Sequence, residues 1–149
     1  MTDVRSSKIR SNLSRKMAQP GGRTIADALA RADQGVEGHR EAAMRKLADH
    51  LEQLETISRQ REPGCEALIY DRAAAFLDMA GFFETGPLYT AAFSLCQLSD
   101  RMTALGVWDW PSVEVHLRAL RLILSSGCVT GAASDEVLNG LAAVARRYV

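Results

Sequence analysis

The chain has 149 residues, 47% of them apolar and 24% charged, which is typical of one globular domain and excludes wholesale disorder. Eighteen basic residues balance eighteen acidic ones, so the net charge is zero and does not attract the negatively charged backbone of a nucleic acid. No apolar run reaches the roughly 20 residues of a membrane-spanning helix, and the N-terminal residues lack the apolar core of a secretory signal. These features predict a cytoplasmic protein that binds neither nucleic acid nor membranes.

The N-terminal segment is basic and ends in turn-forming residues. Its first 23 residues carry six basic side chains and one acidic one, with Gln19-Pro20-Gly21-Gly22 near the end. Such a segment is typical of a flexible arm. We therefore expect a basic arm over 1–23 and a single domain over 24–149.

A long amphipathic helix is predicted to follow, from about 24 to 60. Thr24 and Asp27 have the spacing of a capping box, and apolar residues then recur at three- and four-residue steps. Gly35 and Gly38 each cost roughly 1 kcal/mol inside a helix, so they are its weak point, and whether the helix kinks, breaks or continues near 35–38 stays open. Pro63-Gly64 ends the segment.

Four shorter helices are predicted downstream, and no stretch shows the alternation of a strand. They cover about 65–81, 87–105, a segment that follows Asp109-Trp110-Pro111-Ser112 and stops by Gly127, and a last one from an N-cap at Ser134 to about 148. Because the links are short, neighbouring helices should run antiparallel. The predicted fold class is all-α, an antiparallel bundle of about five helices.

Catalytic and metal-binding motifs are missing from the sequence. It has no GxSxG elbow, no glycine-rich phosphate loop and no HExxH or CxxC pair. We therefore expect no enzyme activity, no metal and no cofactor, with unpaired thiols and surface or half-buried histidines. Whether a histidine accepts phosphate stays open. The residues concerned are Cys65, Cys96, Cys128, His39, His50 and His116.

Residues 70–98 resemble the central hairpin of histidine-containing phosphotransfer (HPt) domains of bacterial two-component signalling. The positions that carry the resemblance are Ala80, Gly81, Phe83, Leu88, Ala91, Ala92 and Leu95. In this register the family's phosphorylated histidine falls on Ala74, and a glycine that leaves room for the phosphoryl group falls on Asp78. Without an imidazole no phosphoramidate forms at 74, and a carboxylate at 78 repels a phosphoaspartate. The resemblance therefore implies an HPt-like bundle that does not transfer phosphate.

Two further segments resemble the CheE accessory proteins of alphaproteobacterial chemotaxis operons. They are Ala18-Gln19-Pro20-Gly21-Gly22 and Ala91-Ala92-Phe93-Ser94-Leu95-Cys96. This resemblance implies a role in chemotaxis signalling.

The second predicted helix presents a mixed apolar and acidic face beside its core stripe. The residues on it lie at three- and four-residue spacing: Tyr70, Asp71, Ala74, Leu77 and Asp78. We expect this face to bind a response-regulator receiver domain or another chemotaxis protein. Phe93, on the next helix, is expected to be covered by the first helix, and Trp108 and Trp110 to cover one end of the bundle.

The alternative function is assembly through the long first helix. Its heptad-like apolar run from Val36 to Ile57 would allow a homodimer. The same stripe is needed to cover the other helices of its own chain, which favours a monomer.

Overall fold

The computed structural model describes residues 24–148, and within this range the chain is helical without any strand. The predicted arm over 1–23 lies outside the described residues. Five α-helices follow one another: α2 (Ile25–Gln60), α3 (Cys65–Phe82), α4 (Pro87–Leu105), α5 (Trp110–Ser125) and α6 (Ala132–Ala145), with a 3₁₀ helix at Arg146–Tyr148. The predicted all-α class is confirmed. None of these helices is long and apolar enough to cross a membrane.

The chain divides into two compact units, residues 1–38 and 39–149. The boundary falls inside α2, whereas the sequence predicts one domain from residue 24. In the first unit, residues 24–38 are all exposed. In the second unit α2 changes character, because Ala43, Leu47, Leu51 and Leu54 are buried in the core of the bundle.

The N-terminus of α2 forms the predicted capping box. The Asp27 backbone N–H donates to Thr24 Oγ1 over 3.1 Å, and the Thr24 N–H donates to Asp27 Oδ2 over 3.2 Å. The sequence left open whether this helix continues through Gly35 and Gly38, and in the structure both lie inside a continuous helix. Neither glycine has any atom within 4 Å of the position of an added Cβ, so nothing in the described chain requires glycine there.

A tight turn joins α3 to α4. The buried Thr85 hydroxyl donates to the Ala80 carbonyl over 3.0 Å and holds the chain against the end of α3. Pro87 then occupies the first turn of α4, where its missing N–H has no helical partner to lose. Gly106 ends α4 with φ at 65°, a left-handed conformation that favours glycine. These boundaries match the prediction to within a residue.

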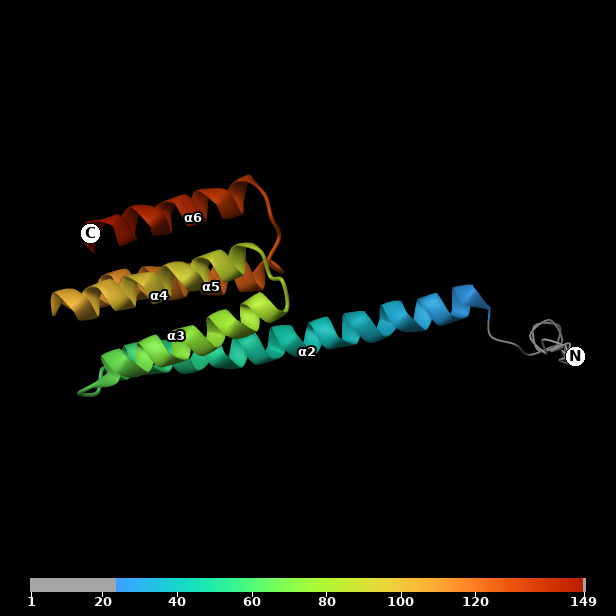
Figure 1. The fold of residues 1–149 in the computed structure, drawn as a ribbon, viewed down its shortest axis with the longest axis horizontal. Coiled ribbons are helices and arrows are strands. Elements are labelled where there is room, and N and C mark those ends of the chain that lie inside the picture. The colour runs from blue at the N-terminus through green and yellow to red at the C-terminus, as the bar shows by residue number, and fades with distance from the viewer. Residues whose placement is uncertain (1–23, 149) are drawn as a thin grey trace, which may run out of the picture. The chain divides into compact units, whose positions relative to one another are not determined.

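Helix α4 is the centre of the 39–149 unit. It packs against α3, α5 and α6, and Figure 1 shows it running between α3 and α6 with α5 beside it. Its apolar stripe, which includes Leu88, Leu95 and Leu98, is fully buried. The core around it is completed by Phe76 of α3 and Leu120 of α5, so α3, α5 and α6 turn their apolar faces towards α4.

The last helix begins earlier than predicted. Its N-cap is Gly131, and Ser134 is the third helical residue. The Gly131 N–H donates to Ser134 Oγ over 2.9 Å, and that hydroxyl donates back to the Gly131 carbonyl over 2.8 Å. The Ser134 hydroxyl therefore does bond to the helix terminus, but from inside the first turn.

Trp108 and Trp110 pack partly buried against one end of the core, as predicted, with ring centroids 5.5 Å apart. Between them, Asp109 caps α5 by accepting from the backbone N–H of Ser112. Asp109 Oδ2 also accepts from the hydroxyl of Tyr148 over 2.6 Å. This shared carboxylate joins the start of α5 to the last turn of the described chain.

Candidate functional site

The five residues predicted for partner binding do lie on α3 away from its buried stripe. Tyr70, Asp71 and Asp78 are exposed, whereas Ala74 is half-buried. Leu77 is also half-buried and packs against the core, so it supports this surface more than it adds to it. The predicted residues therefore form an accessible strip of α3. They do not include the residues of the neighbouring helix that belong to the same surface.

Helix α4 supplies the other half. An added Cβ at Gly81 would lie 3.1 Å from Cε2 of Tyr89, so the tyrosine ring rests on the glycine of α3. The Asp78 carboxylate is close enough to Cys96 to raise the pKa of its thiol. Tyr89, Phe93 and Cys96 follow four- and three-residue steps along one side of α4. The two strips are therefore neighbours across the hairpin.

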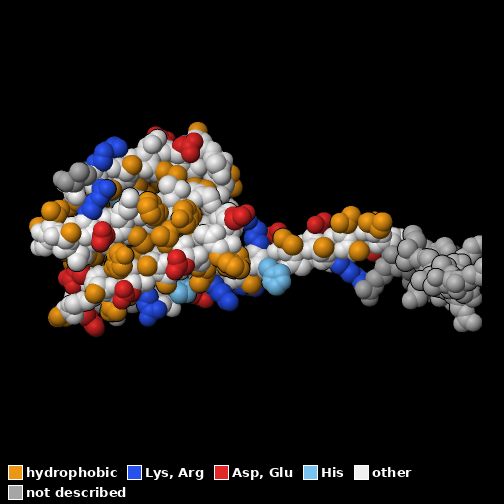
Figure 2. Space-filling view, viewed as in Figure 1, with side chains coloured by type: hydrophobic (Ala, Val, Ile, Leu, Met, Phe, Trp, Pro, Cys, Tyr) orange, Lys and Arg blue, Asp and Glu red, His pale blue; other side chains and the backbone are white. Residues whose placement is uncertain are grey.

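Phe93 is 44% exposed, so the expectation that the first helix covers it is wrong. It lies between Tyr89 and Cys96 on the same side of α4, and Tyr89 and Tyr70 are exposed to 43% and 42%. We call the surface formed by these residues and their α3 neighbours the hairpin face: Tyr70, Ala74, Leu77, Asp78, Gly81, Tyr89, Phe93 and Cys96. Figure 2 shows hydrophobic side chains gathered on the side of the unit where α3 and α4 lie in front, with acidic side chains among them.

A shallow cavity of about 450 Å³ lies at the turn end of the hairpin face. Gly81, Tyr89 and the turn residues Glu84, Thr85 and Gly86 line it. The absence of a side chain at Gly81 keeps this cavity open, because an added Cβ would push against the Tyr89 ring. The cavity is therefore a hollow at the edge of the apolar surface.

The hairpin face carries aromatic rings and carboxylates and no imidazole. Position 74 carries a methyl group and no nucleophile, and Asp71, Asp78 and Asp100 give this side of the hairpin acidic character. Burial, and after it the charge of Asp78, raises the pKa of the Cys96 thiol to about 11, so the thiol is protonated at neutral pH. A surface of aromatic rings with scattered carboxylates suits an apolar partner with basic residues at its rim.

None of the three histidines is among the residues of the hairpin face. His116 is fully buried, which corrects the expectation of a surface or half-buried residue. Its Nδ1 lies 2.8 Å from the Ser112 carbonyl, and its Nε2 lies 2.9 Å from Ser94 Oγ. Nδ1 must donate to the carbonyl, so Nε2 accepts the serine proton. Burial lowers the pKa of His116, which is neutral at physiological pH.

His39 is exposed and His50 half-buried, and each lies on α2. Over residues 24–148, no group of three or more His, Cys, Asp or Glu side chains is placed to hold a metal ion. Searches of protein-family models, curated proteins and solved structures found no match to this chain.

Proposed function

We propose that this chain is a noncatalytic module of bacterial two-component or chemotaxis signalling, an HPt-like pseudo-phosphotransfer bundle that binds a receiver domain through the hairpin face. The module works in the cytoplasm, without nucleic acid or membrane as a partner. The observation that carries this proposal is the pair of neighbouring strips on α3 and α4, which leave Tyr70, Tyr89 and Phe93 accessible on one surface.

Exposed aromatic residues on a folded helical surface support a protein-binding role. Monomeric proteins rarely leave a contiguous apolar patch uncovered unless it contacts a partner, and aromatic side chains are enriched in interface cores. The packing of α3 and α4 fixes these rings on rigid helices, which lowers the entropic cost of binding. Receiver domains are the partner class that the resemblance of residues 70–98 implies.

The side chains at positions 74 and 78 support a module that binds without accepting phosphate. Ala74 has no atom that forms a phosphoramidate, and Asp78 places a negative charge beside it. Incubation with a radiolabelled phosphorylated receiver should leave this chain unlabelled. A stable, acid-labile label on it would contradict the proposal, and single replacement of His39, His50 and His116 would then locate the acceptor.

Ala74→Arg tests the binding role directly. Position 74 is half-buried at the edge of α3, so a long side chain can reach solvent and the loss of stability should stay within about 1 kcal/mol. The bulky cation should nevertheless abolish binding to purified receiver domains in a surface-immobilised assay. Circular dichroism melting provides the control for folding. A folded variant that binds every receiver as well as the parent would refute the hairpin face as a docking site.

The alternative, a homodimer through the first helix, is favoured by a different observation. Ile25, Leu29 and Val36 are between 59% and 81% exposed, although they follow four- and seven-residue steps. With Ala32 they fill successive a and d positions of a heptad pattern. The predicted stripe beyond residue 42 is no longer available for a second chain, because Leu47, Leu51 and Leu54 are buried in their own bundle. Pairing would therefore involve residues 25–36 only.

Light scattering coupled to size-exclusion chromatography tests this alternative. If the parent is a dimer, Leu29→Glu should convert it to a monomer, because the charge falls in the middle of the apolar stripe. Ala30→Glu is the matched control, because residue 30 is exposed and lies off that stripe. A parent that is monomeric at all concentrations rules out the dimer and leaves receiver binding in place.

A further inference from the structure

The α3–α4 hairpin carries the whole negative excess of the 39–149 unit. Residues 65–105 contain five acidic and two basic residues, whereas the rest of the unit contains nine of each. Both basic side chains reach other helices: Arg101 donates from Nη1 to the Ala145 carbonyl of α6 over 3.2 Å, and Arg72 lines a pocket against α2. The hairpin is therefore an acidic region of a bundle that is otherwise neutral, and it favours a basic partner.

The hollow at the turn end of the hairpin face contains one carboxylate and no basic residue. We call it the turn hollow, and it is lined by Gly81, Glu84, Thr85, Gly86 and Tyr89. Glu84 is exposed and makes no ion pair with any residue of the described range 24–148. A partner therefore reaches this charge without displacing an ion pair of the bundle.

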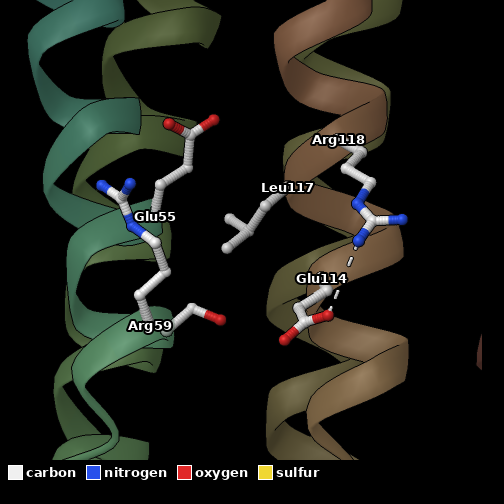
Figure 3. A pocket seen from close by; sticks show the side chains of 6 residues that line it. Glu55, Arg59, Glu114, Leu117 and Arg118 are labelled. Carbon is white, nitrogen blue, oxygen red and sulfur yellow. Dashed lines mark ion pairs between the residues drawn. The ribbon is translucent and has the colours of Figure 1, made fainter.

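The groove between α2 and α5 shows the opposite situation. Its volume is about 310 Å³, and Figure 3 shows Glu55 and Arg59 on one helix and Glu114 and Arg118 on the other. Arg118 pairs with Glu114 at 3.8 Å along α5, and Arg121 binds Glu55 at 2.6 Å. Because these carboxylates already have cationic partners within the bundle, the turn hollow is the better place for an external cation.

The Tyr89 ring forms an apolar wall of the turn hollow. It is 43% exposed, and its Cε2 atom would lie 3.1 Å from a Cβ added at Gly81, so the edge of the ring rests on the glycine. An aromatic ring beside a carboxylate suits an arginine, because a guanidinium group stacks on aromatic rings and pairs with a carboxylate through two hydrogen bonds. The lining of the turn hollow therefore has the chemistry of an arginine site.

Glu84 has a backbone conformation that disfavours its side chain. Its φ is 51°, in the left-handed region, where glycine is under less strain than glutamate. The turn would therefore form at least as well with glycine at this position. A binding role of the carboxylate accounts for a glutamate there.

We propose that the turn hollow binds one arginine side chain of the partner protein, with Glu84 as its ion-pair partner and the Tyr89 ring against its guanidinium group or stem. The inference rests on the proposed function for the class of the partner, and on the described hollow for the chemistry of the contact. Because the turn hollow lies at one end of the hairpin face, an arginine bound there fixes the direction in which the partner lies along that face.

NMR titration of the ¹⁵N-labelled full chain with N-acetyl-arginine amide tests the contact without any receiver. N-acetyl-citrulline amide has nearly the same shape and no charge, so it is the matched ligand, and the ionic strength is held constant. The arginine ligand should shift amide signals within residues 81–89 saturably, with a dissociation constant on the order of 10 mM. The citrulline ligand should give no saturable shift. No saturable shift with arginine, or equal shifts with both ligands, would overturn the proposal.

Variants of two residues identify the groups that bind. Glu84→Gln should weaken arginine binding about fivefold, because it removes the ion pair. Glu136→Gln makes the same change at an exposed position of α6 and should leave binding unchanged. Tyr89→Phe should retain binding and Tyr89→Leu should weaken it, because only the first keeps an aromatic ring. Glu84→Gly should lose binding with a melting temperature no lower than that of the parent. Equal weakening by Glu84→Gln and Glu136→Gln would refute the site.

The receiver-binding assay separates this inference from the proposed function. Where the parent binds a receiver, Glu84→Gln should weaken that binding about fivefold or more. A parent that binds the arginine ligand through Glu84 and binds no receiver supports the turn hollow and refutes the receiver as its partner. A Glu84→Gln variant that binds the receiver as tightly as the parent leaves the hairpin face intact and refutes the turn hollow as part of the interface.

Discussion

His116 Nε2 lies 2.9 Å from Ser94 Oγ, and this pair joins α5 to α4 inside the bundle. The imidazole is fully buried and its pKa is lowered below 6.5, first by burial. The unfolded chain therefore binds a proton at this residue more readily than the folded chain does. The contribution of neutral His116 to the free energy of unfolding should therefore be fully present above pH 6.5. It should decrease as the pH falls from 6.5 towards the lowered pKa of the folded chain.

Urea denaturation between about pH 7.5 and pH 5.5 measures this effect. The parent should lose stability over that range, and His116→Gln, although less stable at the upper pH, should lose less. His39→Gln removes an exposed histidine and should behave as the parent does. Parallel pH profiles for the parent and His116→Gln would show that the buried imidazole does not govern the acid response.

Asp109 should stabilise the end of the bundle, because its Oδ2 atom accepts hydrogen bonds from both Ser112 and Tyr148. Hydrogen bonds from the Ser112 and Tyr148 side chains lower the pKa of Asp109 below 3.8. Tyr148→Phe should cost about 1 kcal/mol at pH 7, and Asp109→Ala about 1–2 kcal/mol because it also removes the N-cap of α5. The contribution of Asp109 should disappear as the pH falls through its lowered pKa. Guanidinium denaturation of both variants at neutral and acidic pH checks the two costs.

Gly35→Ala should stabilise α2. The glycine is helical and has open space around its missing Cβ, so alanine adds helix propensity without a clash, about 0.5–1 kcal/mol. Amide hydrogen exchange of residues 25–38 is the suitable readout, because local opening dominates in an exposed helix. Gly106→Ala provides the contrast: its φ of 65° strains alanine, so that variant should be less stable. Faster exchange in Gly35→Ala would contradict the continuous helix.

Asp78→Asn should make Cys96 more reactive. The carboxylate adds to burial in raising the pKa of that thiol to about 11, so its removal should lower the pKa and increase the thiolate fraction at a fixed alkaline pH. Alkylation by iodoacetamide, followed residue by residue with mass spectrometry, measures this change. Asp100→Asn is the comparison on α4, because Asp78 is the charged residue that raises the pKa of the Cys96 thiol. An unchanged alkylation rate in Asp78→Asn would show that the Asp78 carboxylate of α3 does not lie close to the Cys96 thiol of α4, and would contradict the packing of the two strips side by side.

Helix boundaries were predictable where their causes are local. Thr24 and Asp27, or Pro87 and Gly106, act on backbone groups a few residues away, so their spacing alone identifies them. The start of α6 was placed too late because a serine hydroxyl bonds equally well as an N-cap or from the first turn. Ser134 takes the second position. Sequence spacing does not distinguish these two geometries.

The site was predictable only in its α3 half. The exposure of Phe93 depends on where α2 packs, and the burial of His116 depends on the serine that α4 presents to it. Tertiary packing decides both, and the spacing of residues along the chain does not encode it.

Phe93→Glu tests the receiver-binding role of the hairpin face most directly, with Val115→Glu as its matched control. The two positions are 44% and 42% exposed, the first on the hairpin face and the second on α5, so both substitutions should leave the melting temperature nearly unchanged. Binding to purified receiver domains, phosphorylated and unphosphorylated, is measured by biolayer interferometry. The parent and Val115→Glu should bind the same receiver with equal affinity, and Phe93→Glu should weaken that binding at least about tenfold. Equal binding by all three proteins, or binding by none, would contradict the proposed function.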